Sequence, residues 1–233
     1  MPARKMSELS VVTFTIYTYL ICLAFSFICS GFNFRKHPLH LKLLSVLLFI
    51  TLINECIAFW GHKFLNLSNN LKVYNVFIPI EVTFYCLYFK CVISLKWFKY
   101  FVGITLIVFF LFWYTTTFKI FQIQKWNSYV SIFENVIITF MATAYYYQLF
   151  ILSPLKELRK HTEFWIATGL IICYTCTLPF TGMLNYLLSN YDVYEFLAGI
   201  LVVALQIFNI ILYSLIAYAF LCRINTRKLL WLQ

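Results

Sequence analysis

Long apolar runs separated by short polar segments dominate the chain. A membrane-spanning helix needs about 20 apolar residues. Loop-forming residues break the chain at intervals of about that length, among them Arg35 to Pro38, Asn66 to Asn70 and Ser189 to Asp192. The pattern predicts an all-α polytopic membrane bundle that forms a single integral membrane domain over 1–233. Its seven expected transmembrane helices cover 10–31, 41–61, 73–94, 99–118, 128–152, 163–187 and 194–222.

The composition supports this class. Hydrophobic residues make up 63% of the 233 residues and charged residues 11%, against about 45–50% and about 25% in soluble domains. A water-soluble fold of this length would leave too much apolar surface in contact with solvent. We therefore expect the lipid bilayer to be the main partner, with many of the 26 Phe and 17 Tyr facing lipid or its interface.

The net charge of +10 does not predict nucleic-acid binding, because the basic residues lie between the apolar runs. In that position they orient a membrane protein, with the more basic side in the cytoplasm. Six fall on one side: Arg4, Lys5, Lys63, Lys72, Lys119 and Lys125. Twelve fall on the other: Arg35, Lys36, Lys42, Lys90, Lys96, Lys99, Lys156, Arg159, Lys160, Arg223, Arg227 and Lys228. The count predicts an outside amino terminus and a cytoplasmic carboxyl terminus, although Arg4 and Lys5 oppose it.

The basic face is expected to contact an anionic lipid or a cytoplasmic protein partner. His37 and His40 beside it are expected in a turn that faces lipid headgroups, with a weak surface metal site as the alternative. Cys173 and Cys176 have CxxC spacing, but they lie inside an expected helix, where Cys acts as a small hydrophobe. The chain has no HxxxH, phosphate loop or GxSxG motif, and no Lys in the last apolar run. We expect no cofactor, no metal and no retinal Schiff base.

Three acidic residues interrupt the apolar runs: Glu55, Glu81 and Glu134. An ionisable side chain inside a membrane costs a few kcal/mol on insertion scales and is a functional hypothesis by default. Glu55 lies about 14 residues up the second expected helix, roughly 21 Å at 1.5 Å per residue. The other two lie about 8 and about 6 residues below the same surface on helices of opposite direction. All three are therefore expected at comparable depth in the outer half.

Polar residues accompany these acids at helical spacing. Two prolines, Pro79 and Pro179, lie in the same half, and each frees the carbonyl four residues earlier. The predicted polar pocket, or proton or cation site, consists of Glu55, Glu81, Glu134, Asn54, Asn135, Tyr85, Gln206 and Asn209. No Lys or Arg lies deep in the apolar runs, and three anions do not coexist in low dielectric. At least one acid is therefore expected to be protonated or to hold a cation. The alternative is that each is neutral and hydrogen-bonded to Tyr, Asn or backbone.

Two segments, HTEFWIATGLIICY at 161–174 and NVFIPIEVTFYCLYF at 75–89, carry a resemblance to an uncharacterised family of small bacterial inner-membrane proteins with seven spans. The resemblance covers the plan of most of the chain. It implies a location in the bacterial inner membrane and no activity, substrate or site residue.

Without a catalytic constellation, the sequence favours a non-enzymatic sensor, signalling or effector component with an outward-facing polar pocket. One alternative is a proton- or cation-coupled transporter or channel that uses the three glutamates. Another is a membrane-embedded enzyme acting on lipid, with Glu as general base. The oligomeric state is not predicted.

Overall fold

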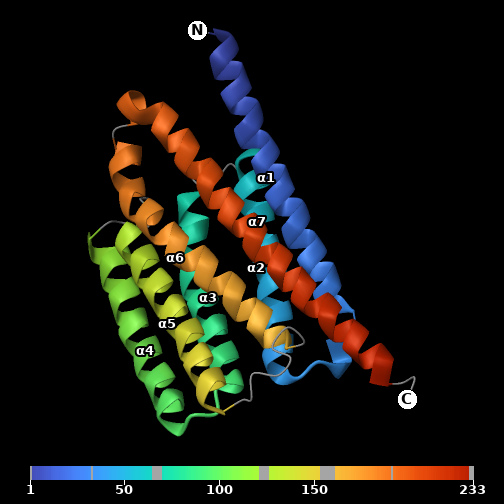
Figure 1. Ribbon diagram of the computed structural model, residues 1–233. Coiled ribbons are helices and arrows are strands. Elements are labelled where there is room, and N and C mark those ends of the chain that lie inside the picture. The colour runs from blue at the N-terminus through green and yellow to red at the C-terminus, as the bar shows by residue number, and fades with distance from the viewer. Residues whose placement is uncertain are drawn as a thin grey trace.

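The computed structural model describes residues 2–32, 34–64, 70–120, 126–152, 161–189 and 191–230, which form seven α-helices (Figure 1). The helices are α1 Pro2–Gly31, α2 Leu39–Phe64, α3 Leu71–Val92, α4 Lys96–Tyr114, α5 Ser128–Leu152, α6 Thr162–Ser189 and α7 Tyr191–Leu230. A 3-10 turn, η1 Phe34–Lys36, precedes α2, and a π-helical turn, η2 Thr115–Ile120, extends α4. The described residues contain no strand. The all-α class is confirmed, and each helix coincides with one of the seven apolar runs.

Six of the seven helices are long and apolar enough to cross a bilayer, which indicates an integral membrane protein. The helix outside this group is α5, although it has 25 residues. Its length suffices for a span, but Glu134, Asn135 and Gln148 lower its hydropathy. Two predicted site residues, Glu134 and Asn135, are therefore among those that lower the hydropathy of α5.

α7 packs along α6 on one side and α1 on the other, while α5 packs against α6 and α2 against α3. Figure 1 shows α4 at the margin of the bundle, and its contacts are with α3, η2 and, less extensively, α5. Only Phe98, Val102 and Phe109 are buried in α4. The termini of the chain lie at opposite ends of the bundle (Figure 1).

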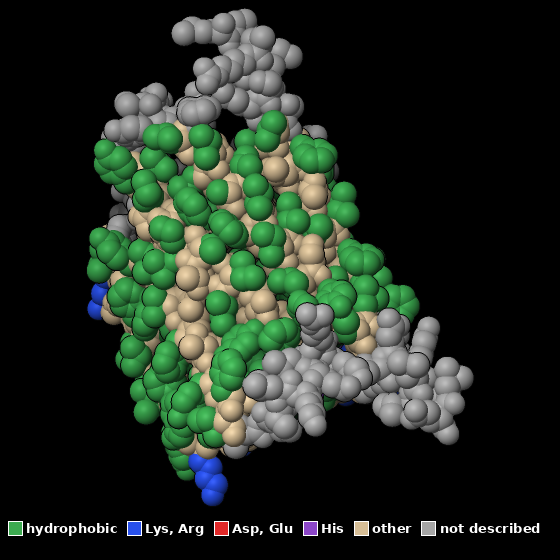
Figure 2. All heavy atoms as spheres, in the orientation of Figure 1, with side chains coloured by type: hydrophobic (Ala, Val, Ile, Leu, Met, Phe, Trp, Pro, Cys, Tyr) green, Lys and Arg blue, Asp and Glu red, His purple; other side chains and the backbone are tan. Residues whose placement is uncertain are grey.

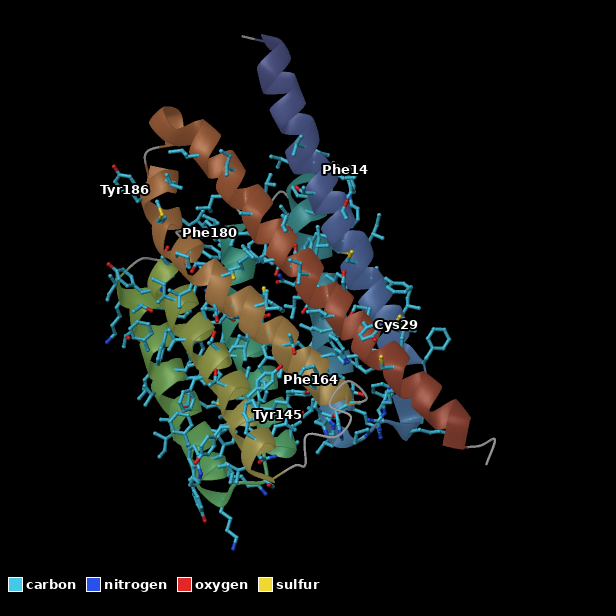
Figure 3. The ribbon with its side chains drawn as sticks, viewed as in Figure 1. Phe14, Cys29, Tyr145, Phe164, Phe180 and Tyr186 are labelled. Atoms are coloured by element: carbon cyan, nitrogen blue, oxygen red, sulfur yellow. The ribbon has the colours of Figure 1, made fainter. Side chains whose placement is uncertain are left out.

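Side chains pack closely in the interior at the end of the bundle where α2 and α6 begin and where α3 and α5 end. We call this region the filled half; it comprises the buried side chains of 23–30, 39–48, 82–93, 137–149, 162–170 and 212–220. In Figure 3, Cys29 of α1, Tyr145 of α5 and Phe164 of α6 mark its level. Among its most deeply buried side chains are Leu23, Leu41, Phe89, Met141, Ile166 and Phe220. Packing of apolar side chains stabilises this half. Few glycines are present to let the helices approach closely, so larger side chains fill the space between them.

Hydrophobic side chains cover the face of the bundle that Figure 2 presents, and Lys or Arg side chains lie at its margins. On α4, for example, Ile104, Ile107 and Leu111 are each more than 60% exposed. Such a surface would be costly in water and is suited to lipid. Exposed basic residues, including Lys90, Lys96 and Lys99, lie at the end of the filled half.

The two histidines near η1 do not form a headgroup-facing turn, so that prediction was wrong. His37 is only 5% exposed, and its ring lies 5.5 Å from the ring of Phe220 in α7. His40 belongs to α2, where its Nε2 lies 2.9 Å from Oε1 of Glu163 in α6. The turn brings both rings back onto the bundle, a long-range contact that local charge pattern does not reveal.

Candidate functional site

A cavity of about 200 Å³ lies in the other half of the bundle, which we call the hollow half. Every α-helix except α4 contributes to its wall, together with Trp126 just before α5. On α6 the cavity residues begin at Cys173, well beyond Phe164, and continue past Phe180, which Figure 3 shows towards the opposite end. The polar and aromatic side chains of the wall are Tyr19, Thr51, Glu55, Tyr74, Phe77, Glu81, Trp126, Ser131, Glu134, Asn135, Cys173, Tyr174, Thr177, Thr181, Asn209 and Tyr213.

All three glutamates predicted from the sequence line this one cavity. Their helices alternate in direction, so residues from the end of α2 and from the beginnings of α3 and α5 meet at one level. This is the arrangement that the depth argument anticipated. The role of these residues as a binding or proton site stays a prediction.

Glu55 accepts hydrogen bonds from two tyrosines of neighbouring helices. The hydroxyl of Tyr74 in α3 lies 3.2 Å from its Oε2, and Tyr19 in α1 donates a second hydrogen bond. Both tyrosines act as donors, because a carboxylate offers only acceptors. The pair of donors holds the Glu55 side chain between α1 and α3.

Glu81 and Glu134 form a linked pair. The hydroxyl of Tyr174 in α6 donates to Oε1 of Glu81 at 2.6 Å, and a side-chain hydrogen bond joins Glu81 to Glu134. A hydrogen bond between two carboxyl groups requires a proton on one of them, because a carboxylate has no donor. Glu81 and Glu134 therefore link α3 and α5 in the cavity wall.

Three buried polar atoms of the cavity wall have no hydrogen-bond partner: Oε1 of Glu134, Oγ of Ser131 and Nε1 of Trp126. Glu134 and Ser131 are 5% and 3% exposed. Leaving such a group unsatisfied costs about 1–3 kcal/mol. One acceptor, one hydroxyl and one N–H donor thus remain available to a molecule that enters the cavity.

Asn135 and Asn209 also reach the wall and are held by side chains of α6. Nδ2 of Asn135 donates to Oγ1 of Thr181 at 3.2 Å and of Thr177 at 3.4 Å. Oδ1 of Asn209 accepts from the Cys173 thiol at 3.7 Å. Cys173 and Cys176 are free thiols.

The other predicted site residues do not line the cavity. Asn54 and Gln206 each leave one buried side-chain atom, Nδ2 and Oε1, without a partner away from the wall. Tyr85 is 2% exposed and stands behind Tyr174, with a side-chain hydrogen bond to it and 5.9 Å between ring centroids. Tyr85 therefore supports the site without facing it.

Several wall residues were missed by the sequence prediction. Tyr174, Thr177 and Thr181 repeat at three and four residues on α6, a polar stripe that helical spacing could have revealed. Tyr19 had no such signal, since it is one of 17 tyrosines in an apolar run. Trp126 lies in a loop, where periodicity gives no information.

Pro79 shapes the wall next to Glu81. Because proline has no N–H, the carbonyl of Asn75 loses its intrahelical donor. Nε1 of Trp113 in α4 donates to this carbonyl at 2.9 Å. The bond joins the peripheral α4 to α3 beside the cavity.

The charges of the cavity wall are all of one sign. Its residues include three Glu and no Lys, Arg or His. Within the described part of the chain, no three His, Cys, Asp or Glu side chains are grouped closely enough to hold a metal ion. The arrangement suits a proton or a cation that brings its own hydrogen-bond donors.

Fold and cavity together define a helical membrane bundle with a carboxyl-rich polar cavity. No family model, curated protein or solved structure matches the chain.

Proposed function

We propose that this is a non-enzymatic multi-pass protein of the bacterial inner membrane that acts as a sensor, signalling or effector component. In this proposal all seven helices span the bilayer, with the amino terminus outside and the carboxyl terminus in the cytoplasm. The cavity then opens towards the outer side, and the basic end of the filled half faces the cytoplasm. Ligand occupancy in the cavity is the input.

The observation that supports binding over conduction is how the cavity ends. Directly beyond Glu81, α3 places Val82, Tyr85, Tyr88 and Phe89 in the interior, each at most 2% exposed. At the same level, α5, α6 and α7 contribute four side chains that are each 0% exposed: Ile138, Met141, Leu170 and Ile216. A conduction pathway needs groups that replace the hydration of the ion. The described interior of the filled half offers a packed barrier of apolar side chains and two tyrosine hydroxyls at this level, which supports binding over the passage of a hydrated ion.

Two helices connect the cavity to the basic end. α2 carries Glu55 in the cavity wall and His40 at its beginning, and α6 carries Tyr174 in the wall and Glu163 at its beginning. The hydrogen bond of 2.9 Å between His40 and Glu163 joins these helices beyond the barrier. A ligand that moves one helix against the other therefore changes this contact.

The readout is proposed at the basic end. Arg223 of α7 lies close enough to Glu163 to interact with it electrostatically. The exposed Lys90, Lys96 and Lys99 lie at the same end. A cytoplasmic protein partner or an anionic lipid would meet this surface.

A double-mutant cycle on the thermal unfolding of the full chain in lipid nanodiscs tests the coupling. Glu134→Gln changes the cavity and His40→Gln changes the contact at the other end. Distant, independent sites add within about 0.5 kcal/mol, and we expect a larger deviation for this pair. The control replaces Glu134→Gln by Thr143→Val on the exposed side of α5. Additivity of the cavity pair, equal to that of the control, would overturn the sensor proposal.

The hydrogen-bonded Glu81 and Glu134 pair favours one second candidate, proton- or cation-coupled transport, because such pairs hold and release protons. Proton and cation flux into liposomes tests it for the unmodified protein and for Glu55→Gln, Glu81→Gln and Glu134→Gln. Transport requires flux in the unmodified protein that the variants reduce. Zero flux in all four proteins removes this candidate.

A further inference from the structure

We propose that the cavity binds a small organic molecule carrying a protonated primary amine and, four carbons away, a hydroxyl oxygen. The inference names the ligand class of the proposed sensor and so rests on that function. Amino alcohols of about six non-hydrogen atoms belong to this class.

Charge selects the amine. Three carboxyl groups line the cavity, and its wall contains no basic side chain. Tyrosine hydroxyls already donate to Glu55 and Glu81, whereas Oε1 of Glu134 has no donor. An ammonium group supplies the missing positive charge. An acid or a zwitterionic amino acid would place a further carboxylate against these three groups.

Hydrogen bonding selects a primary ammonium over an alkali or quaternary cation. Oε1 of Glu134 is buried and has no donor. A primary ammonium provides three N–H donors and makes a short, charge-assisted hydrogen bond with such an oxygen. The rings of Tyr74, Trp126 and Tyr174 line the wall, where they can contact the carbon chain. A quaternary ammonium would keep the ring contacts and leave Oε1 of Glu134 unsatisfied.

The other two unpartnered atoms of the wall favour a ligand that also carries a hydroxyl oxygen. Nε1 of Trp126 is a donor that needs an acceptor, and Oγ of Ser131 accepts or donates. Ser131 precedes Glu134 by three residues on α5, so the two side chains share a face and lie about 5–6 Å apart at Cβ. A chain of about four carbons is long enough for one ligand to place an amine at Glu134 and a hydroxyl at Ser131.

Volume sets the size. The cavity of about 200 Å³ equals the volume of about six or seven liquid waters at about 30 Å³ each. A chain of four carbons with a nitrogen and an oxygen has six non-hydrogen atoms and matches it.

The test compares two probes that differ in one group, 4-aminobutan-1-ol and butane-1,4-diol, on the full chain in nanodiscs. Binding is followed by saturable change of tryptophan fluorescence, to which Trp126 contributes, and by the shift of the unfolding midpoint. We expect the amino alcohol to bind at least tenfold more tightly than the diol. Glu134→Leu, which removes the acceptor oxygen, should remove most of this preference, whereas Thr143→Val should retain it. Ser131→Ala should reduce the advantage of 4-aminobutan-1-ol over butylamine.

Each other outcome overturns the inference in a distinguishable way. Equal binding of diol and amino alcohol would show that charge does not select the ligand. Amine binding unchanged in Glu134→Leu would place the amine elsewhere. Binding of neither probe, together with the non-additivity of Glu134→Gln and His40→Gln, would reject the ligand class and leave the sensor function standing. Binding of neither probe with full additivity would reject both.

Discussion

The filled and hollow halves are built by the same helices and differ in what those helices place inside. In α3, Phe89 is completely buried in the filled half, whereas Glu81, eight residues earlier, lines the cavity. In α6, Ile166 belongs to the packed core and Tyr174 to the polar wall. The comparison separates two tasks along each helix. One half fixes how the helices pack, and the other keeps polar groups available to a ligand.

The hollow half can bury its glutamates because most of their side-chain oxygens have hydrogen-bond partners within the bundle. Tyrosines from α1, α3 and α6 supply donors to Glu55 and Glu81. Burying a charge without such partners would be far more costly. Within the cavity wall, the atoms left without a partner belong to Glu134, Ser131 and Trp126. The cost of leaving them open is consistent with a place where a ligand, and not the protein, completes the network.

The largest predicted effect breaks the filled half. Phe89→Ala, at a side chain that is 0% exposed, should lower the free energy of unfolding by about 2–3 kcal/mol, below the water-soluble value because no transfer to water is involved. Phe77→Ala in the cavity wall should cost clearly less, since it enlarges space that already exists. Unfolding midpoints in nanodiscs measure both. Equal losses would contradict the division into halves.

An intermediate effect is expected in the hollow half. Tyr174→Phe removes the donor that lies 2.6 Å from Glu81 and leaves a buried carboxyl oxygen unsatisfied, at a cost of about 1–3 kcal/mol. Tyr147→Phe is the matched control, because Tyr147 is 56% exposed on the outer side of α5. The same unfolding assay applies. If both substitutions have the same effect, the Tyr174 bond does not stabilise the site.

The smallest effect belongs to the contact between His40 and Glu163. Their side chains are 17% and 20% exposed, and partly solvated pairs contribute about 0–1 kcal/mol. Glu163→Gln should therefore change stability less than Tyr174→Phe does, while altering amide exchange at the beginnings of α2 and α6. Hydrogen exchange followed by mass spectrometry measures it. A stability loss as large as that of Tyr174→Phe would make this contact part of the packed core instead.

Much of the fold was predictable because apolar length and loop chemistry determine where membrane helices begin and end. The common depth of Glu55, Glu81 and Glu134 followed from the rise per residue and the alternation of direction. Side-chain direction was harder. Asn54 adjoins Glu55 in sequence, but successive helical residues differ by about 100°, and Asn54 does not line the cavity.

The neighbours that the sequence did not reveal depend on which helices pack together. Tyr19 reaches Glu55 because α1 lies against α2 and α7, and Tyr174 reaches Glu81 across the bundle. Gln206 and Asn209 are three residues apart and lie on nearly the same face of α7. The rotation of α7 places Asn209 in the cavity wall and Gln206 outside it. Pairing and rotation of helices are set by long-range packing, which periodicity within one helix does not encode.

The central claim is that the hollow half is a binding site closed on the side of the filled half. A single cysteine at Ser131, introduced as Ser131→Cys in a chain whose eight native cysteines are replaced, reports access to the cavity. A membrane-impermeant cationic thiol reagent is applied to one side of oriented proteoliposomes at a time. We predict labelling from the side of the amino terminus alone; labelling from both sides would show a passage and contradict the account.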